Sequence, residues 1–222
     1  MQNVIAIDGP AASGKSTIAK TLARTLGIPY INTGNMYRAV TVQALGTGLN
    51  PDSELSDSQI ETLLSGIELD YIPSANGSLE LRMNGIFPGD AIRSPEVTTH
   101  VSKISAIPAV RDWLVKKQRE FASSGQIVME GRDIGTVVFP QAKNKFFLTA
   151  SPEVRAKRRL AQDGETFNGA TVESVAREIA ARDEMDMNRA VSPLRKADDA
   201  TLIDSSNMTV DEVIAKIVSL LK

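Results

Sequence analysis

Short hydrophobic runs rich in β-branched residues recur along the chain, separated by longer stretches in which hydrophobic residues repeat every three or four positions. Each short run predicts a strand that is buried on both faces, and each longer stretch predicts a helix with one buried side. The predicted strands lie at residues 4–7, 30–31, 127–129, 146–148 and 202–203. Strands that alternate with helices form right-handed βαβ units, so the pattern predicts an α/β fold in three layers with a five-stranded parallel sheet.

Residues that favour helix ends mark where the predicted helices begin and stop. The first helix begins at Lys15 and stops before Gly27 and Pro29, and a second runs from about Thr33 to about Gly46. The later helices are predicted to begin at Ser56, at Ser94 followed by Pro95, at Pro108, at Ser151 followed by Pro152, at Thr171 and at Thr209.

Residues 66–89 follow a different pattern. Hydrophobic and polar residues alternate at 67–72 and again at 79–83, and the dipeptide Asn76-Gly77 between them is typical of a tight hairpin turn. One face of each predicted strand is polar. We therefore expect a small antiparallel β insert near the surface of the protein.

Composition and charge narrow the possible chemistry. The 222 residues include no Cys, which excludes disulfides and thiolate zinc sites. The single His, His100, argues against His-based metal clusters and against a Ser-His-Asp triad. The 25 basic and 27 acidic residues give a net charge of −2, which argues against a nucleic-acid binder. The N-terminus lacks the features of a signal peptide, and no apolar run approaches the length of a membrane span. We expect a soluble, cytoplasmic protein that is not membrane-bound.

A phosphate-binding motif follows the first predicted strand. The segment Gly9-Pro10-Ala11-Ala12-Ser13-Gly14-Lys15-Ser16 fits the P-loop pattern G-x-x-x-x-G-K-[ST], and Thr17 continues it into the first helix. The backbone N–H groups of such a loop face phosphate oxygens, and the helix N-terminus adds partial positive charge. Lys15 can neutralise the β- and γ-phosphates, and the Ser16 hydroxyl can ligate Mg²⁺. The sequence therefore predicts a site for ATP or GTP.

Arginines gather after the third and fourth strands, on the side of a parallel sheet where ligands usually bind. The third strand leads into Glu130-Gly131-Arg132-Asp133, and the later arginines are Arg155, Arg158, Arg159, Arg177, Arg182, Arg189 and Arg195. Acidic neighbours leave open that single arginines belong to a solvated helix face. As a set they favour a kinase of a small phosphorylated acceptor, because donor and acceptor phosphates repel each other in a closed site. The chain lacks the N-K-x-D tetrapeptide of a GTPase.

Four segments, in this order along the chain, resemble the bacterial cytidylate kinases, which are P-loop kinases of nucleoside monophosphates. They are the P-loop, Thr33-Gly34-Asn35-Met36-Tyr37-Arg38, residues 131–140 and residues 182–194. The resemblance covers essentially the whole chain, and residues 131–140 (GRDIGTVVFP) are its most specific part. It implies transfer of the γ-phosphoryl group of ATP to CMP or dCMP, with Mg²⁺, in pyrimidine nucleotide metabolism.

The resemblance also implies the role of individual residues. The catalytic residues would be Lys15, Arg132 and Arg189, and the lid residues that bind ATP would be Arg155, Arg158 and Arg159. The acceptor phosphate would be held by Arg38, Arg132 and Arg189, the sugar by Arg182 and Asp186, and the cytosine by Ser102, Arg111 and Asp133, with Thr33 close to the nucleotide. Asn32 and Glu130 stand where many members have Asp, so neither is assigned to the metal, which leaves Ser16.

The same resemblance gives a domain organisation. We expect one P-loop kinase domain over residues 1–222, with a core (about 1–31, 113–154 and 186–222), an acceptor-binding segment that carries the β insert (about 32–112) and a helical lid (about 155–185). A polar stretch at 162–169 predicts a mobile loop in the lid. We expect a monomer with no nucleic-acid partner. Two alternatives stay open: a kinase that prefers another small acceptor, such as UMP, and a regulator that holds ATP without turnover.

Overall fold

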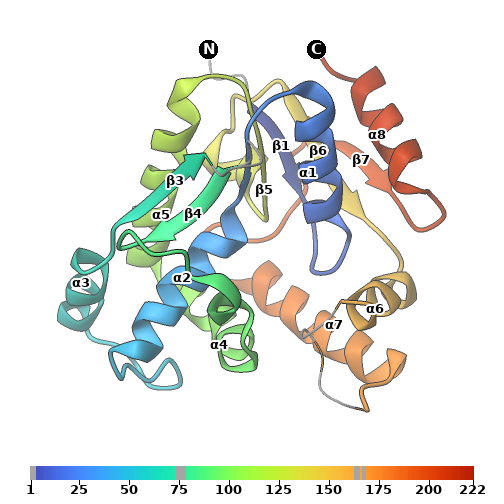
Figure 1. Ribbon diagram of the computed structural model, residues 1–222. Coiled ribbons are helices and arrows are strands. Elements are labelled where there is room, and N and C mark those ends of the chain that lie inside the picture. The colour runs from blue at the N-terminus through green and yellow to red at the C-terminus, as the bar shows by residue number, and fades with distance from the viewer. Residues whose placement is uncertain (1–3, 74–78, 163–165, 167–168) are drawn as a thin grey trace. The chain divides into compact units, whose positions relative to one another are not determined.

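The computed structural model of the protein describes residues 4–73, 79–162, 166 and 169–222. The chain divides into two compact units, one formed by Met1–Asn32 with Ala122–Lys222 and the other by Thr33–Phe121. Figure 1 labels the helices and strands of both units. The division of function into core, acceptor segment and lid stays a prediction.

The first unit is built on a five-stranded sheet in the order β2-β5-β1-β6-β7, in which every neighbouring pair is parallel. Its strands are β1 (Val4–Asp8), β2 (Tyr30–Asn32), β5 (Ile127–Gly131), β6 (Asn144–Thr149) and β7 (Thr201–Asp204). The predicted five-stranded parallel sheet is therefore confirmed. Because β1 is the central strand, the loop that follows it lies between the carboxyl ends of β5 and β6, where ligands of such sheets bind.

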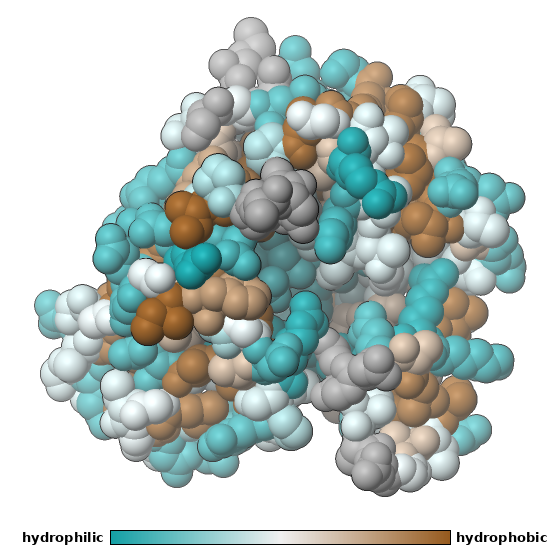
Figure 2. Space-filling model, in the orientation of Figure 1, coloured by the Kyte–Doolittle hydropathy of each residue, from teal (hydrophilic) through white to brown (hydrophobic). Residues whose placement is uncertain are grey.

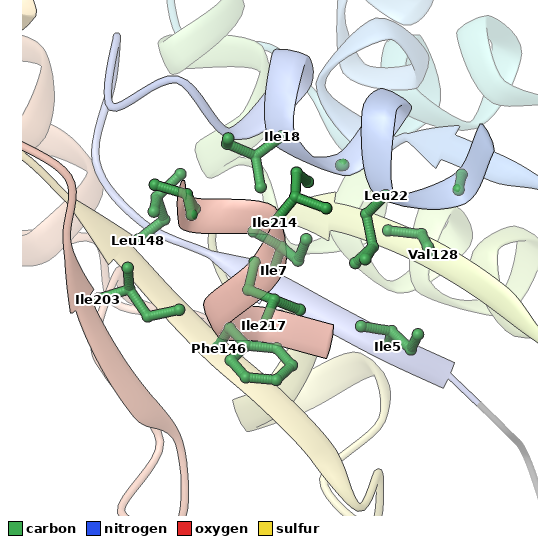
Figure 3. Packing of buried hydrophobic residues seen from close by; sticks show 13 residues of the cluster. Ile5, Ile7, Ile18, Leu22, Val128, Phe146, Leu148, Ile203, Ile214 and Ile217 are labelled. Atoms are coloured by element: carbon green, nitrogen blue, oxygen red, sulfur yellow. The ribbon is translucent and has the colours of Figure 1, made fainter. Parts of the chain in front are cut away.

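One face of this sheet is covered by α1 (Lys15–Leu26) and α8 (Val210–Ser219). Figure 3 shows Ile18 and Leu22 of α1 beside Ile214 and Ile217 of α8. They pack on side chains that neighbouring strands direct to the same face from alternate positions, such as Ile5 and Ile7 of β1. All of these residues are buried. Each fully buried aliphatic side chain of this kind contributes about 1.5–3 kcal/mol of hydrophobic free energy, so this packing anchors the two ends of the unit to its sheet.

Two further helices, α6 (Pro152–Leu160) and α7 (Val172–Asn188), pack against each other in the same unit. A small buried cluster joins them to the loop after β1, because Ala11 packs with Ala156 of α6 and with Val175 and Ile179 of α7. Most of the predicted loop at 162–169 lies outside the described residues. The helices on either side of it have Ser151 and Thr171 as their N-cap residues, and both side chains cap the helix as the sequence predicts.

The second unit contains helices and one hairpin. Its elements are α2 (Thr33–Gly46), α3 (Asp57–Ser65), β3 (Leu69–Pro73), β4 (Leu79–Met83), α4 (Pro95–Ala106) and α5 (Pro108–Phe121). The strands β3 and β4 pair in antiparallel fashion, which confirms the predicted β insert. The predicted turn at Asn76-Gly77 lies outside the described residues.

Three short helical segments complete the described chain: η1 (Gly89–Arg93), η2 (Ala122–Ser124) and η3 (Ile134–Val138), of which η3 has π-helical hydrogen bonding. Figure 2 shows hydrophilic residues over much of the visible face, with hydrophobic residues in small patches among them. In the part of the chain that the structure describes, no helix combines the length and the apolar character that crossing a bilayer requires.

Candidate active site

The P-loop connects β1 to α1 by a turn that depends on its glycines. Gly9 has a φ of +152°, and a Cβ at this position would lie 2.1 Å from the carbonyl oxygen of Leu148. Gly14 has a φ of +93° and precedes α1 without a side-chain cap on the helix. Because the N-cap residue of α1 is a glycine, no N-cap side chain occupies the first N–H groups of the helix. An anion site requires N–H groups that are open in this way.

Lys15 folds back over this loop. Its ammonium donates to the carbonyl oxygen of Pro10 at 2.6 Å and to the hydroxyl of Ser13 at 3.3 Å, and the residue is buried. The next two residues, Ser16 and Thr17, are exposed. The loop therefore presents a preorganised cation and a hydroxyl at the start of a helix, which is the arrangement that binds a phosphate chain.

The surroundings of Lys15 disfavour its charged form while no anion is bound. Its pKa is lowered to about 7, chiefly because burial disfavours the ammonium and secondly because the guanidinium of Arg132 lies nearby. Three carboxylates offset part of this effect: Glu130, Asp183 and Asp8. A bound phosphate chain would remove the mismatch by supplying the missing negative charge.

This pKa gives a test in the nucleotide-free protein. An unfolded lysine keeps its proton up to about pH 10, whereas Lys15 in the folded protein loses it from about pH 7, so the folded state binds fewer protons in that window. The free energy of unfolding should rise between pH 7 and pH 9 by about 1–2 kcal/mol more in the native protein than in Lys15→Met. Urea denaturation of both proteins measures the difference. An identical pH dependence would contradict the proposed state of Lys15.

Three side chains of the predicted lid region hold the backbone of the P-loop. Asp183 of α7 accepts the Ala11 N–H at 2.8 Å and pairs with Arg155 of α6, which also donates to the Ala11 carbonyl at 3.2 Å. Arg158 donates to the Ser13 carbonyl at 3.0 Å and to both the hydroxyl and the carbonyl of Ser205. Two of the three arginines predicted to bind ATP thus contact the loop itself. The third, Arg159, lies on α6 and is partly buried.

Four residues predicted to bind the acceptor form a cluster of alternating charge in the first unit, in which Asp133 and Asp186 are buried and Arg132 and Arg189 are partly buried. Arg132 donates to Asp186 at 2.9 Å, and Arg189 lies 3.8 Å from both Asp186 and Asp133. Burial alone would raise the pKa of Asp186, but the charges of Arg132 and Arg182 outweigh it and lower the pKa. Asp186 therefore favours its ionised form, and it orients two guanidinium groups that can take a phosphate by bidentate hydrogen bonds.

Four more predicted acceptor residues lie in the second unit, and all of them are buried. The ninth, Arg182, is a half-buried residue of α7 in the first unit. Arg38 donates to the Ile92 carbonyl at 2.8 Å and to the Thr98 hydroxyl at 3.0 Å. Arg111 is only 1% exposed; it donates to the carbonyl of Ser105 near the end of α4 and lies 5.2 Å from the centre of the Tyr37 ring. Ser102 is on α4, and Thr33 is the first residue of α2. The residues are thus fixed by their own unit.

Sequence analysis missed two buried carboxylates next to the P-loop. Asp8 ends β1 and accepts the N–H groups of Ile134 and Gly135 at 2.8 and 2.7 Å. Asp183 is one of the acidic neighbours that the sequence offered as partners for the arginines, and it contacts the loop as described above. Asp8 had a detectable signal, since a carboxylate that ends a wholly apolar strand must find partners on another segment.

The site fits a magnesium–nucleotide complex. Mg²⁺ usually takes one or two protein oxygens and otherwise binds water and substrate phosphates. The exposed Ser16 hydroxyl at the start of α1 meets this requirement, with the Asn32 amide 3.4 Å from it. Glu130 accepts a hydrogen bond from the Tyr30 hydroxyl at 2.5 Å, so the Glu130 carboxylate is directed toward the Tyr30 side chain on β2. Within the described residues no cluster of three or more acidic, His or Cys side chains offers a competing metal site.

Comparison with known proteins extends over the whole chain. The sequence profile of the family described as cytidylate kinase matches residues 5–222. A cytidylate kinase of Clostridium botulinum (strain Loch Maree / Type A3) is 46% identical over 218 residues, which cover 98% of this chain and 97% of that protein. A cytidylate kinase of Desulforamulus reducens is 48% identical over 220 residues, which cover 97% of this chain and 95% of that protein.

A solved structure supports the fold independently. The shikimate kinase of Bacteroides thetaiotaomicron superposes with a TM-score of 0.50 at 14% identity and covers 98% of this chain and 97% of its own. This likeness agrees with the P-loop kinase fold that the sequence predicts. The full-length sequence matches lead to one conclusion: the chain belongs to the cytidylate kinase family.

Proposed function

We propose that the protein is a cytidylate kinase, which transfers the γ-phosphoryl group of ATP to CMP or dCMP and yields ADP with CDP or dCDP. One observation carries the proposal. A chain of this family holds a complete P-loop and, in the same unit, the charge cluster of Arg132, Asp133, Asp186 and Arg189. Donor and acceptor phosphates thus each meet prearranged cations, as a phosphoryl transfer between two anions requires.

On the donor side, the backbone of residues 9–17 cradles the phosphates of ATP, and Lys15 neutralises the group that is transferred. Ser16 holds Mg²⁺, which supplies further charge neutralisation when it is bound. Arg155, Arg158 and Arg159 bind ATP from the lid. The observed contacts of Arg155 and Arg158 with the Ala11 and Ser13 carbonyls support this assignment, because they keep both guanidinium groups beside the loop.

On the acceptor side, Arg132 and Arg189 clamp the phosphate of CMP together with Arg38, and Arg182 and Asp186 bind the sugar. The pairing of Asp186 with both arginines supports this role, since it fixes their orientation before the acceptor arrives. Ser102, Arg111 and Asp133 read the cytosine, with Thr33 near the nucleotide. A carboxylate accepts from the exocyclic amino group of cytosine and repels the carbonyl that uracil presents there.

No strong nucleophile is needed, because the attacking oxygen already belongs to the acceptor phosphate. The residues work by positioning and by charge neutralisation. We further propose that residues 32–112 move as the acceptor segment and 155–185 as a lid over a core of the remaining residues, and that the enzyme acts as a cytoplasmic monomer.

The experiment is an ADP-coupled assay of the purified protein with ATP, Mg²⁺ and a panel of CMP, dCMP, UMP, AMP and GMP. We expect CMP and dCMP to give the highest kcat/KM, and Lys15→Ala to abolish the signal. A preference for UMP would redirect the assignment to another nucleoside monophosphate kinase. Binding of ATP without acceptor-dependent turnover would favour a regulator.

A further inference from the structure

Asp8 stands at a costly position for a carboxylate. It is the last residue of β1, it is 5% exposed, and it directly precedes the loop that we assign to the phosphates of ATP. A buried negative charge there opposes anion binding. Burial and the neighbouring Asp133 raise the pKa of Asp8 to about 7, although two backbone N–H groups and Lys15 oppose that rise. A residue kept in such a place needs a function that an apolar side chain cannot supply.

The geometry identifies that function as capping of another segment. The two carboxylate oxygens of Asp8 accept separate hydrogen bonds, from the Ile134 N–H at 2.8 Å and the Gly135 N–H at 2.7 Å. These are the first two N–H groups of η3. The residue in the N-cap position of η3 is Asp133, and its side chain makes no capping bond. Asp8 therefore does, from 126 and 127 positions away in the sequence, what the carboxylate of an N-cap Asp ordinarily does for its own helix.

The consequence concerns Asp133 and Arg132. A carboxylate that caps its own helix is turned toward the helix backbone, whereas Asp133 lies 3.8 Å from Arg189 in the charge cluster. Arg132, one residue earlier, reaches Asp186 in the same cluster. The strand register pairs Asp8 with Gly131, so the cap acts directly beside these two residues.

We propose that Asp8 is a positioning residue: by capping η3 it releases the Asp133 carboxylate and holds Arg132 and Asp133 in place for the acceptor nucleotide. In this role Asp8 acts through η3 and not by contact with a substrate. Asp8 directly precedes Gly9, the first residue of the P-loop. The cap therefore fixes the acceptor-binding side chains of Arg132 and Asp133 relative to the P-loop. This inference rests on the proposed function.

Gly135 supports the proposal from the opposite side of the same contact. A Cβ at Gly135 would lie 3.3 Å from Asp8 Oδ2 and 3.1 Å from the Lys145 side chain, which is tighter than ordinary packing. Gly135→Ala therefore forces the Asp8 carboxylate or the Lys145 side chain to shift by a few tenths of an ångström, while it leaves the carboxylate and its charge in the protein. It separates a disturbed contact from loss of the charge.

The test compares Asp8→Asn and Gly135→Ala with the native protein. The control is Asp211→Asn, which makes the same replacement of a carboxylate by an amide at an exposed position of α8. The two oxygens of Asp8 accept one N–H each, whereas the amide of Asn has one acceptor oxygen and one NH₂ donor. Asp8→Asn therefore loses one of the two hydrogen bonds. We expect the KM for CMP to rise about tenfold or more in both variants, and the CMP-to-UMP ratio of kcat/KM to fall. The Kd of an ATP analogue, measured by calorimetry, should change less than about twofold, and the control should match the native protein.

Equal losses for ATP and CMP, or an unchanged KM for CMP in both variants, would overturn the proposal. Loss of the folded state in both variants, seen by circular dichroism, would overturn it too, because Asp8 would then support the core alone. A native protein that does not phosphorylate CMP at all would instead refute the proposed function, so the two failures are distinguishable.

Discussion

Lys15→Ala should lower kcat for phosphoryl transfer from ATP to CMP by about a thousandfold or more, while the protein remains folded. The ammonium is buried and fixed by the Pro10 carbonyl and the Ser13 hydroxyl, so it stabilises the developing charge without reorganisation. Steady-state kinetics with saturating ATP and CMP measure the loss. Thermal unfolding should show no destabilisation, because the substitution removes a buried charge whose pKa is already lowered.

The matched control for this experiment is Lys20→Ala, which removes an exposed lysine from the same helix. It should retain nearly native turnover, since its charge is solvated and distant from the turn of the loop. Turnover within about tenfold of the native value in a folded Lys15→Ala protein would refute the P-loop mechanism.

The second large effect concerns base choice. Asp133→Ala should depress kcat/KM for CMP by about tenfold to more than a hundredfold, and much less for UMP, because it removes the acceptor of the cytosine amino group. ATP binding should be largely preserved. The measurement is a pair of kcat/KM values, for CMP and UMP, in the native and variant proteins.

Arg111→Ala supplies the second half of this test, since it removes the donor proposed to face the ring nitrogen and carbonyl of cytosine. Arg111 is nearly fully buried, so circular dichroism must first confirm that this variant folds. Asp211→Ala is the control for general effects of removing a carboxylate. If the CMP-to-UMP ratio stays constant in both folded variants, the base-reading assignment is wrong even though the kinase assignment stands.

The fold could be predicted from sequence where the determining interactions are local. The helix starts at Ser56 and Thr209 depend on a side chain and an N–H group three residues apart, and both capping boxes form as expected. Likewise Gly27 adopts the left-handed conformation that ends α1. Buried strands can be recognised as short runs of apolar residues, so the order of strands and helices can be predicted from the sequence alone.

Contacts between distant segments could not be predicted in the same way. The Asp8–Gly135 bond joins residues 127 positions apart, and the Ala11–Asp183 bond joins residues 172 apart. Nothing in the local sequence of either partner specifies the other. The P-loop could be located because its chemistry lies in one contiguous stretch, whereas the carboxylates that hold its surroundings come from folding of the whole sheet.

The central claim, transfer of a phosphoryl group from ATP to cytidylate, is tested most directly by following the label of [γ-³²P]ATP in the presence of CMP and Mg²⁺. We predict that the label appears in the β-phosphate of CDP, with one ADP formed for each CDP, and that no label moves without CMP. Recovery of the label as inorganic phosphate at the same rate with and without CMP, or its retention in ATP, would contradict the account.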